Sequence, residues 1–243
     1  TLRHFQMNLL LAIKTVRFMP VFFLLCVFVS ALFYPGGNIH DSSQEGYSFT
    51  HNFLSDLGGY SSHSSEQNFL SSFFFNMSMF VFAFVGIAFL WIPQLFRDNT
   101  LDWYLSCLGS FFLFIGTLLF AGVGLTPYDL YLDTHIFFAL NAFRLMVPGC
   151  LCFFIVLLRS NVQKRYSFIA GFYLFSVVAY VFYQMLSTGN PFEDINEMIR
   201  QATIQKIIVI LSVISVLSFS FAFEAQIKIL QQTNTNYADQ QND

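Results

Sequence analysis

The chain has 243 residues, of which 56% are hydrophobic and only 10% are Asp, Glu, Lys or Arg, against about 25% charged residues in ordinary soluble domains. The formal net charge is −3 and no basic segment alternates with aromatic residues, which excludes a soluble globular fold and gives no sign of nucleic-acid binding. We therefore predict an all-α, polytopic membrane protein, because helices satisfy their own backbone groups in lipid.

Six apolar runs are long enough to cross a bilayer, for which about 20 residues are needed. They cover residues 18–34, 72–96, 103–125, 134–158, 166–186 and 203–223. The first contains Val29-Ser30-Ala31, which is similar to a signal-peptide cleavage site, but the run continues past it and five more spans follow. We predict one six-helix domain over residues 1–230 and a polar tail, residues 231–243, that is disordered in the cytoplasm.

Basic residues lie mainly on one side of this predicted bundle. The other side receives only Arg200 and Lys206, whereas the first side receives eight: Arg3, Lys14, Arg17, Arg97, Arg159, Lys164, Arg165 and Lys228. The positive-inside rule then predicts that both termini are cytoplasmic. It also places the first loop, residues 35–71, and the linker 126–133 together on the extracytoplasmic face.

The first loop contains a polar cluster, "THNFLSDLGGYSS", in an otherwise apolar chain. Phe49, Phe53 and Leu57 recur every four residues, which predicts a short amphipathic helix lying on the bilayer surface with its Phe face buried. The same register pairs His51 with Ser55 and Asn52 with Asp56, and Gly58-Gly59 would end the helix.

The linker "TPYDLYLDTH" supplies a second polar group on the same face. Pro127 ends the third span, Asp129 follows it, and Asp133 or Thr134 is placed to cap the fourth helix, with His135 in its first turn. We predict that His135 hydrogen-bonds to Asp56 and so clamps the first loop onto the bundle. The competing hypothesis is that these residues hold a ligand or carry out catalysis.

Two sets of polar residues lie within the predicted spans, where polarity is costly and informative. Arg144 lies about 13 Å into the fourth span, three residues after Asn141. We predict that Arg144 points into the bundle and meets a carboxylate, carbonyl or lipid headgroup, with Asp56, Asp129 and Glu224 as candidate carboxylates. Asn68, Ser72 and Asn76 form a stripe that could line a polar cavity.

The four cysteines lie in apolar runs and predict no disulfide.

Three short motifs carry a resemblance to known families. The first is N-F-L-S-D-L-G at Asn52–Gly58, and the second is Phe75-Asn76. The third is G-x-x-P-x-D with a later His, which corresponds to Gly124, Pro127, Asp129 and His135. The set resembles a bacterial family of six-helix membrane proteins known as domain of unknown function number 998. More distantly it is similar to the damage-regulated autophagy modulator family, which has a similar Ser-Asp-x-Gly in its first outer loop. The resemblance covers residues 35–143 and implies a bacterial inner membrane and a lipid-linked role, without an activity.

These observations leave two functions open. The first is an accessory or lipid-binding subunit, with membrane lipids and other integral membrane subunits as partners and an extracytoplasmic binding site. Its candidate binding residues are His51, Asn52, Asn76, Asp129, Asp133 and Arg144.

The alternative is a lipid hydrolase or lipid-remodelling enzyme with Ser55, Asp56 and His135 as candidate catalytic residues. A divalent metal, held by His51, Asp56 and His135, could activate water for such a reaction. No H-E-x-x-H or comparable spacing supports the metal site.

Overall fold

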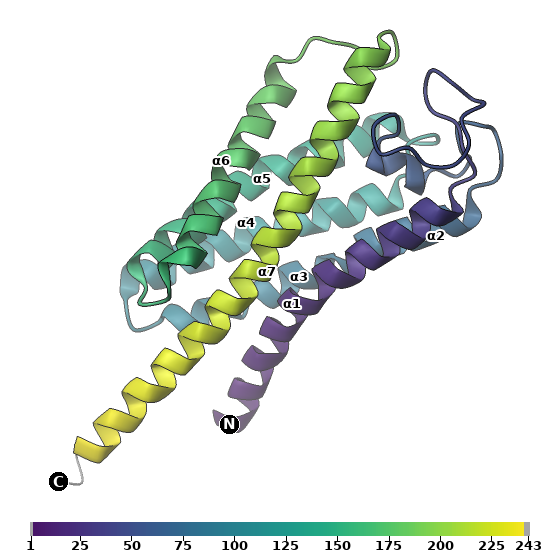
Figure 1. The fold of residues 1–243 in the computed structure, drawn as a ribbon. Coiled ribbons are helices and arrows are strands. Elements are labelled where there is room, and N and C mark those ends of the chain that lie inside the picture. Colours follow the sequence, from purple (N-terminus) through teal and green to yellow (C-terminus); the bar gives the residue numbers. More distant parts are fainter. Residues whose placement is uncertain (1, 241–243) are drawn as a thin grey trace.

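The computed structural model describes residues 2–240, and the surroundings of side chains for residues 7–232. Its helices follow one another along the chain (Figure 1), with bounds α1 Leu2–Phe33, η1 Leu54–Gly58, α2 Phe69–Val81, α3 Ala83–Phe89, η2 Ile92–Phe96, α4 Thr100–Leu125, α5 Leu132–Arg159, α6 Lys164–Leu186 and α7 Ile195–Gln240. Between residues 2 and 240, β-structure is limited to the isolated bridges Gly36–Glu45 and Ser61–Gln67. The all-α prediction is confirmed.

Six stretches of helix are long and apolar enough to span a membrane, as predicted. Five are single helices, whereas the second, Phe69–Phe96, consists of α2, α3 and η2 in series. The break between α2 and α3 falls at Phe82, and Pro93 occupies the first turn of η2. A proline is tolerated in a first turn because the N–H it lacks would have no intrahelical acceptor there.

Both terminal helices are longer than the apolar runs predict. α1 begins at Leu2, and Arg17 on α1 donates to Glu224 on α7 at 2.6 Å, so the polar ends of the two helices pair. α7 continues to Gln240, into the tail for which the sequence predicts disorder. No Gly or Pro follows Leu230 to stop the helix. Residues 241–243 of that tail lie outside the described residues.

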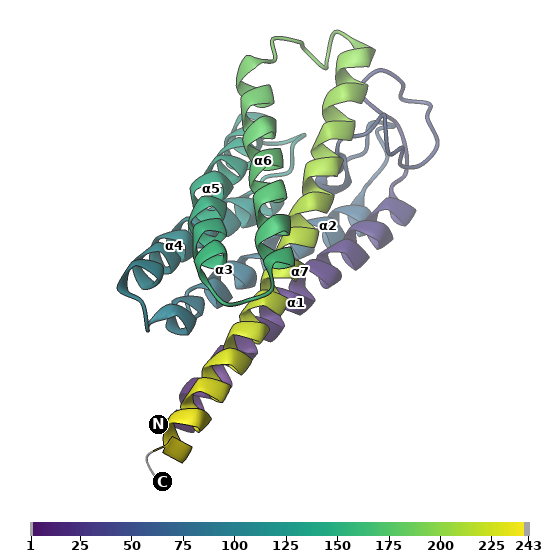
Figure 2. The same cartoon turned by 60° about the vertical axis from the view of Figure 1, so that its left-hand side comes forward.

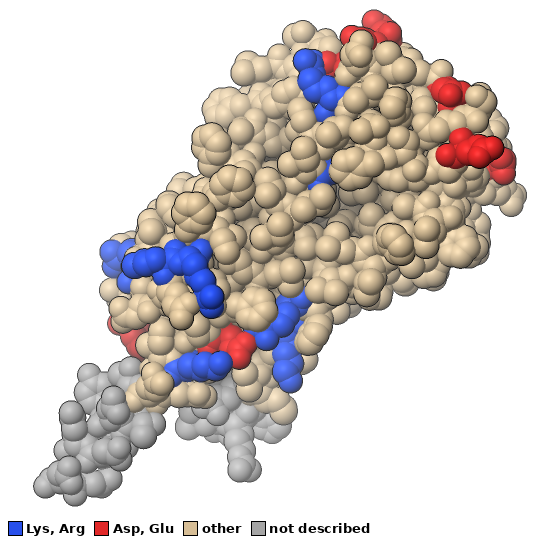
Figure 3. Space-filling view, in the orientation of Figure 1, with Lys and Arg blue, Asp and Glu red and all other residues tan. Residues whose placement is uncertain are grey.

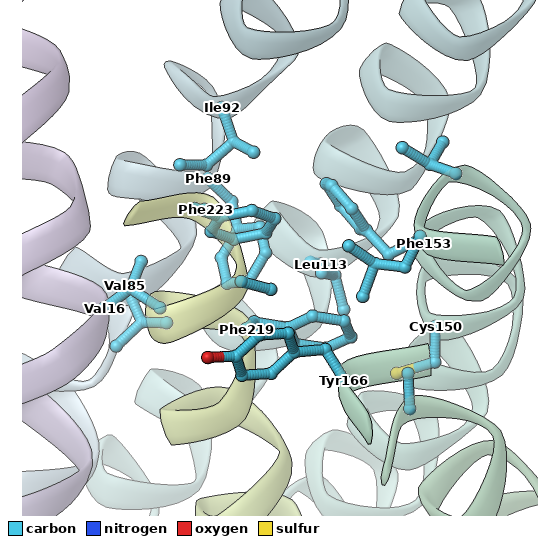
Figure 4. Packing of buried hydrophobic residues seen from close by; sticks show 14 of the residues in the cluster. Val16, Val85, Phe89, Ile92, Leu113, Cys150, Phe153, Tyr166, Phe219 and Phe223 are labelled. Atoms are coloured by element: carbon cyan, nitrogen blue, oxygen red, sulfur yellow. The ribbon is translucent and has the colours of Figure 1, made fainter. Parts of the chain in front are cut away.

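Apolar side chains of several helices pack into one buried cluster, with phenylalanine rings at its centre (Figure 4). The ring of Phe89 on α3 lies 5.3 Å from that of Phe153, 6.1 Å from that of Phe219 and 5.8 Å from that of Phe223. These edge-to-face contacts join α3, α5 and α7. The small-residue seam on α4, which includes Ser110 and Gly124, is buried and lets neighbouring helices approach closely.

The two ends of the bundle differ in charge. Both chain ends lie at the same end of the molecule (Figure 2), and Lys and Arg side chains gather there (Figure 3). Asp and Glu side chains gather at the opposite end, where the long loop after α1 and the α6–α7 connection lie. Most of the basic residues that the sequence assigns to one side of the bundle thus lie together at one end of the structure.

Candidate functional site

The loop after α1 folds onto the bundle with its polar groups inside. Only Leu54–Gly58 is helical, as the 3-10 helix η1, and Phe49 is 52% exposed. Asn52 and Asp56 are buried instead, with 0% and 3% exposed. The predicted amphipathic helix with a buried Phe face is therefore wrong, although the predicted pairing of Asn52 with Asp56 is present. The Asp56 carboxylate accepts the Phe53 N–H at 2.9 Å, which starts the short helix there.

Asp56 is the centre of this buried network. Its Oδ2 accepts from Asn52 Nδ2 at 3.0 Å and lies 3.5 Å from His63 Nε2. The hydrogen bond predicted from His135 is not made. His135 lies one turn inside α5, and its Nδ1 bonds to the Thr126 carbonyl at 2.6 Å. The histidine that lies beside Asp56 is His63, which comes from the same loop.

Lys206 on α7 is the functional residue that the sequence reasoning missed. It is 3% exposed, and its Nζ donates to the carbonyl of Asn52 and, at 3.1 Å, to that of Ala202. The Nζ also lies 5.5 Å from the ring centre of Tyr47 and 5.3 Å from that of Phe49. A single Lys in the apolar run "TIQKIIVI" is the signal that could have identified it.

Three tyrosines of the loops surround the same carboxylate. Burial raises the pKa of Tyr34, Tyr47 and Tyr128, and the negative charge of Asp56 raises each pKa further. The phenols therefore stay protonated at neutral pH and can donate hydrogen bonds. Tyr34 donates to the Gly37 carbonyl at 3.3 Å, and the Tyr128 hydroxyl lies 3.2 Å from His63 Nε2.

Asp129 connects the two outer segments. Its two carboxylate oxygens accept the backbone N–H groups of Tyr60 and Ser61, each at 2.9 Å. The predicted clamp between the first loop and the linker is thus present, but Asp129 provides it. Asp133 is exposed in the first turn of α5, whose N-cap is Tyr131 without a side-chain cap, so the predicted cap by Asp133 or Thr134 is wrong.

The asparagines of the predicted cavity stripe hold η1 in place. Asn68 Nδ2 donates to the carbonyls of Leu57 and Gly59 at 3.1 and 3.0 Å, and Asn76 Nδ2 donates to that of Gly58 at 3.0 Å. A Cβ on Gly58 would lie 2.6 Å from Asn76 Oδ1, so only glycine permits this approach. These amides act as structural donors at the end of η1.

The residues predicted to hold a metal do not form a site. His51 Nδ1 lies 2.8 Å from Thr50 Oγ1, whereas Asp56 and His135 have the separate partners given above. Among the described residues, no group of three or more His, Cys, Asp or Glu is placed to hold an ion. All four cysteines are free, as predicted.

Arg144 does not point into the bundle. It is exposed on the outer face of α5, and its Nη1 donates to Asn141 Oδ1 at 3.3 Å. Buried residues such as His135 and Met146 occupy the opposite face of the same helix. The predicted inward orientation is wrong because α5 is apolar on both faces, so the sequence alone does not indicate which face meets the other helices.

A partly open apolar cavity lies beneath η1, which lines it with Leu54 and Ser55. Four polar side chains reach it, those of Ser55, His135, Gln205 and Ser212. The remaining lining residues are apolar: Phe23, Leu54, Phe75, Met79, Phe82, Phe120, Val123, Ala139, Phe143, Val209 and Val213. A largely apolar lining with a few oriented polar groups is typical of sites for apolar ligands.

The polar groups of the cavity have defined hydrogen-bonding roles. Gln205 Oε1 accepts the Leu54 N–H at 2.8 Å, which leaves its amide N–H groups as donors. His135 Nδ1 donates to a carbonyl, so in the neutral ring Nε2 is an acceptor. The motifs that carry the family resemblance thus meet around one place, formed by η1, the start of α2 and the linker before α5.

Comparisons with protein-family models, with curated proteins and with solved structures give no match for this chain.

Proposed function

We propose that this protein binds a membrane lipid, with an acyl chain in the cavity beneath η1 and the adjoining ester or amide group beside Ser55 and Gln205. The cavity is the observation that carries the proposal, because its apolar lining lies within membrane-spanning helices while its polar groups are few and close to the outer loop. No Asp, Glu, Lys or Arg lines it, which favours the uncharged part of a lipid.

The donors present suit a carbonyl oxygen. The Ser55 hydroxyl and the Gln205 amide can each donate to an ester or amide carbonyl, and His135 Nε2 can accept from a hydroxyl or amide N–H. The distribution of basic residues supports cytoplasmic termini and an extracytoplasmic loop. Together with the family resemblance, it supports an inner-membrane protein of a bacterium that draws its lipid from the outer leaflet.

A photoreactive lipid tests this directly. Phosphatidylethanolamine with a diazirine on one acyl chain is incorporated into vesicles with the purified protein, and the labelled residues are mapped by mass spectrometry. We expect labels on Phe82, Phe120 and Val209, and at least a tenfold loss of these labels in Ala139→Phe, which fills the cavity.

The matched control is Ile136→Phe, which adds a ring of the same kind on an exposed position of α5, three residues earlier. Its cavity labelling should equal that of the wild type. Labels confined to exposed side chains, or equal cavity labelling in Ala139→Phe, would refute lipid binding in the cavity.

A second candidate function is lipid hydrolysis, which one observation favours. Ser55 and His135 line the same cavity, and the Nδ1–H bond to Thr126 leaves Nε2 free to take a proton from a hydroxyl. Among the described contacts, however, no hydrogen bond joins the two side chains. Release of free fatty acid from phosphatidylethanolamine by the wild type, lost in Ser55→Ala while acyl-chain labelling persists, would identify the enzyme. Labelling without release leaves binding as the function.

A further inference from the structure

The outer face of α5 carries a polar group where the membrane offers no partner. Arg144 lies 12 residues after Leu132 and 15 before Arg159, so it is about 18 and 22 Å from the two ends of the helix. With a hydrocarbon core of about 30 Å, this position is close to its middle. Long basic side chains near helix ends reach the headgroups, but a residue at the middle is poorly placed to do so.

A proline in the same part of α5 leaves a backbone carbonyl without its usual hydrogen-bond donor. Pro148 lies within α5 and has no N–H, so the carbonyl of Arg144 lacks the donor that residue i+4 ordinarily supplies. Within the described part of the chain, Arg144 forms no ion pair, and Asn141 is its hydrogen-bonding neighbour. An exposed guanidinium and a backbone carbonyl without its usual helical donor therefore occur at the same residue, near the middle of the span.

The residues around them follow the spacing of a helix-packing seam. Phe137, Asn141, Arg144, Pro148 and Leu151 alternate steps of four and three, which places them on one face of α5. None of the five is buried, and Phe137 and Leu151 are 58% and 44% exposed. We call this face the Arg144 seam. A partner helix lying along it would cover both the apolar side chains and the polar centre.

We propose that the Arg144 seam binds a transmembrane helix of another protein that carries an Asp or Glu near the middle of the bilayer. A carboxylate accepts from the guanidinium and removes the cost of an isolated charge in lipid. A second copy of this chain is a poor occupant, because a two-fold contact would bring Arg144 against Arg144. Its own span carboxylates lie near helix ends or are already paired, such as Asp133 in the first turn of α5 and Glu224 with Arg17.

The test uses model helices in nanodiscs that contain the full-length protein. The probes are three labelled polyleucine transmembrane peptides, one with a central Asp, one with a central Leu, and one with the Asp moved to within one turn of the end. Energy transfer from a labelled protein measures association. We expect the central-Asp peptide to bind at least tenfold more tightly than the other two, and Arg144→Gln to abolish this preference.

Arg97→Gln is the matched control, because Arg97 is an exposed basic residue near the end of a span. It should keep the full preference for the central Asp. Equal binding of the three peptides, or a preference that survives in Arg144→Gln, overturns the proposal. A loss of bound phosphatidylglycerol in Arg144→Gln without any peptide preference would also overturn it and would assign the seam to a lipid phosphate. The outcome is independent of the lipid cavity, because the seam lies on the opposite face of α5 from His135.

Discussion

Lys206 on α7 and Arg144 on α5 are both basic residues within apolar spans, but their surroundings are opposite. Lys206 is buried, bonded to two backbone carbonyls and flanked by two aromatic rings. Arg144 is exposed toward lipid with one asparagine beside it. Where a protein satisfies an intramembrane charge internally, that charge stabilises the fold. Where it leaves the charge on the outside, as at Arg144, we propose that the partner comes from another molecule.

The same contrast separates the outer site into two parts. Asp56, Asn52, Asn68 and Asp129 have partners within the loop and the linker, so they hold the structure together. The side chains of the cavity, above all Ser55 and His135, keep hydrogen-bonding capacity that the described contacts do not use. We therefore assign the first set to stability and the second to ligand contact.

Removing each cation in turn gives the largest expected difference. Lys206→Met should lower the free energy of unfolding in lipid bicelles by about 1–3 kcal/mol, because it leaves the buried Asn52 carbonyl without its donor. Arg144→Met should change it by less than about 0.5 kcal/mol, since the residue has no partner inside the fold. Reversible unfolding followed by tryptophan fluorescence measures both. Similar losses in the two variants would remove the distinction between an internal and an external cation.

An intermediate effect is expected at Asp129, which links the two outer segments from an exposed position. Asp129→Ala should cost about 1 kcal/mol and speed amide hydrogen exchange at Tyr60 and Ser61 by roughly tenfold, since both N–H groups lose their acceptor. Asp133→Ala, in the same linker, should leave exchange at these two amides unchanged. Protection that persists in Asp129→Ala would show that another contact holds the loop.

The smallest effect concerns alkaline pH. Burial raises the pKa of Tyr34, Tyr47 and Tyr128 above the ordinary value of 10.0, so the stability they contribute is complete below pH 10 and declines as pH rises toward their folded pKa values. Tyrosinate absorbance should therefore show these three ionising above pH 10, or only on unfolding. Tyr128→Phe should remove one late-titrating group and leave stability at pH 7 nearly unchanged. Simultaneous ionisation of all eleven tyrosines near pH 10 in the folded protein would contradict this.

The six spans, and the gathering of the polar segments at one end of the bundle, are predictable because hydrophobic length and loop charge are local properties of the chain. Which side chains form hydrogen bonds or ion pairs with one another is not a local property of the chain. His63 and His135 are both histidines on the outer face, and only the folded path of the loop brings His63 to Asp56. In the sequence, Lys206 is only one of the positive charges used to predict topology. Its burial depends on where the backbone of the loop after α1 lies, because the Asn52 carbonyl of that loop accepts its hydrogen bond.

The orientation of Arg144 was equally beyond the sequence. Residues on both faces of α5 are apolar, so periodicity does not indicate which face packs against α4 and α6. The cavity likewise depends on how six separate segments of the chain meet, from α1, η1, α2, α4, α5 and α7, and no motif predicts it. By contrast, the pairing of Asn52 with Asp56 follows from a spacing of four residues and was predicted correctly.

A density map of the wild-type protein in lipid nanodiscs tests lipid binding most directly. We expect elongated density of an acyl chain between Phe120 and Val209, with its head end beside Ser55, Gln205 and His135. An empty or collapsed cavity, with ordered lipid only on the outer surface of the helices, would contradict the proposed function.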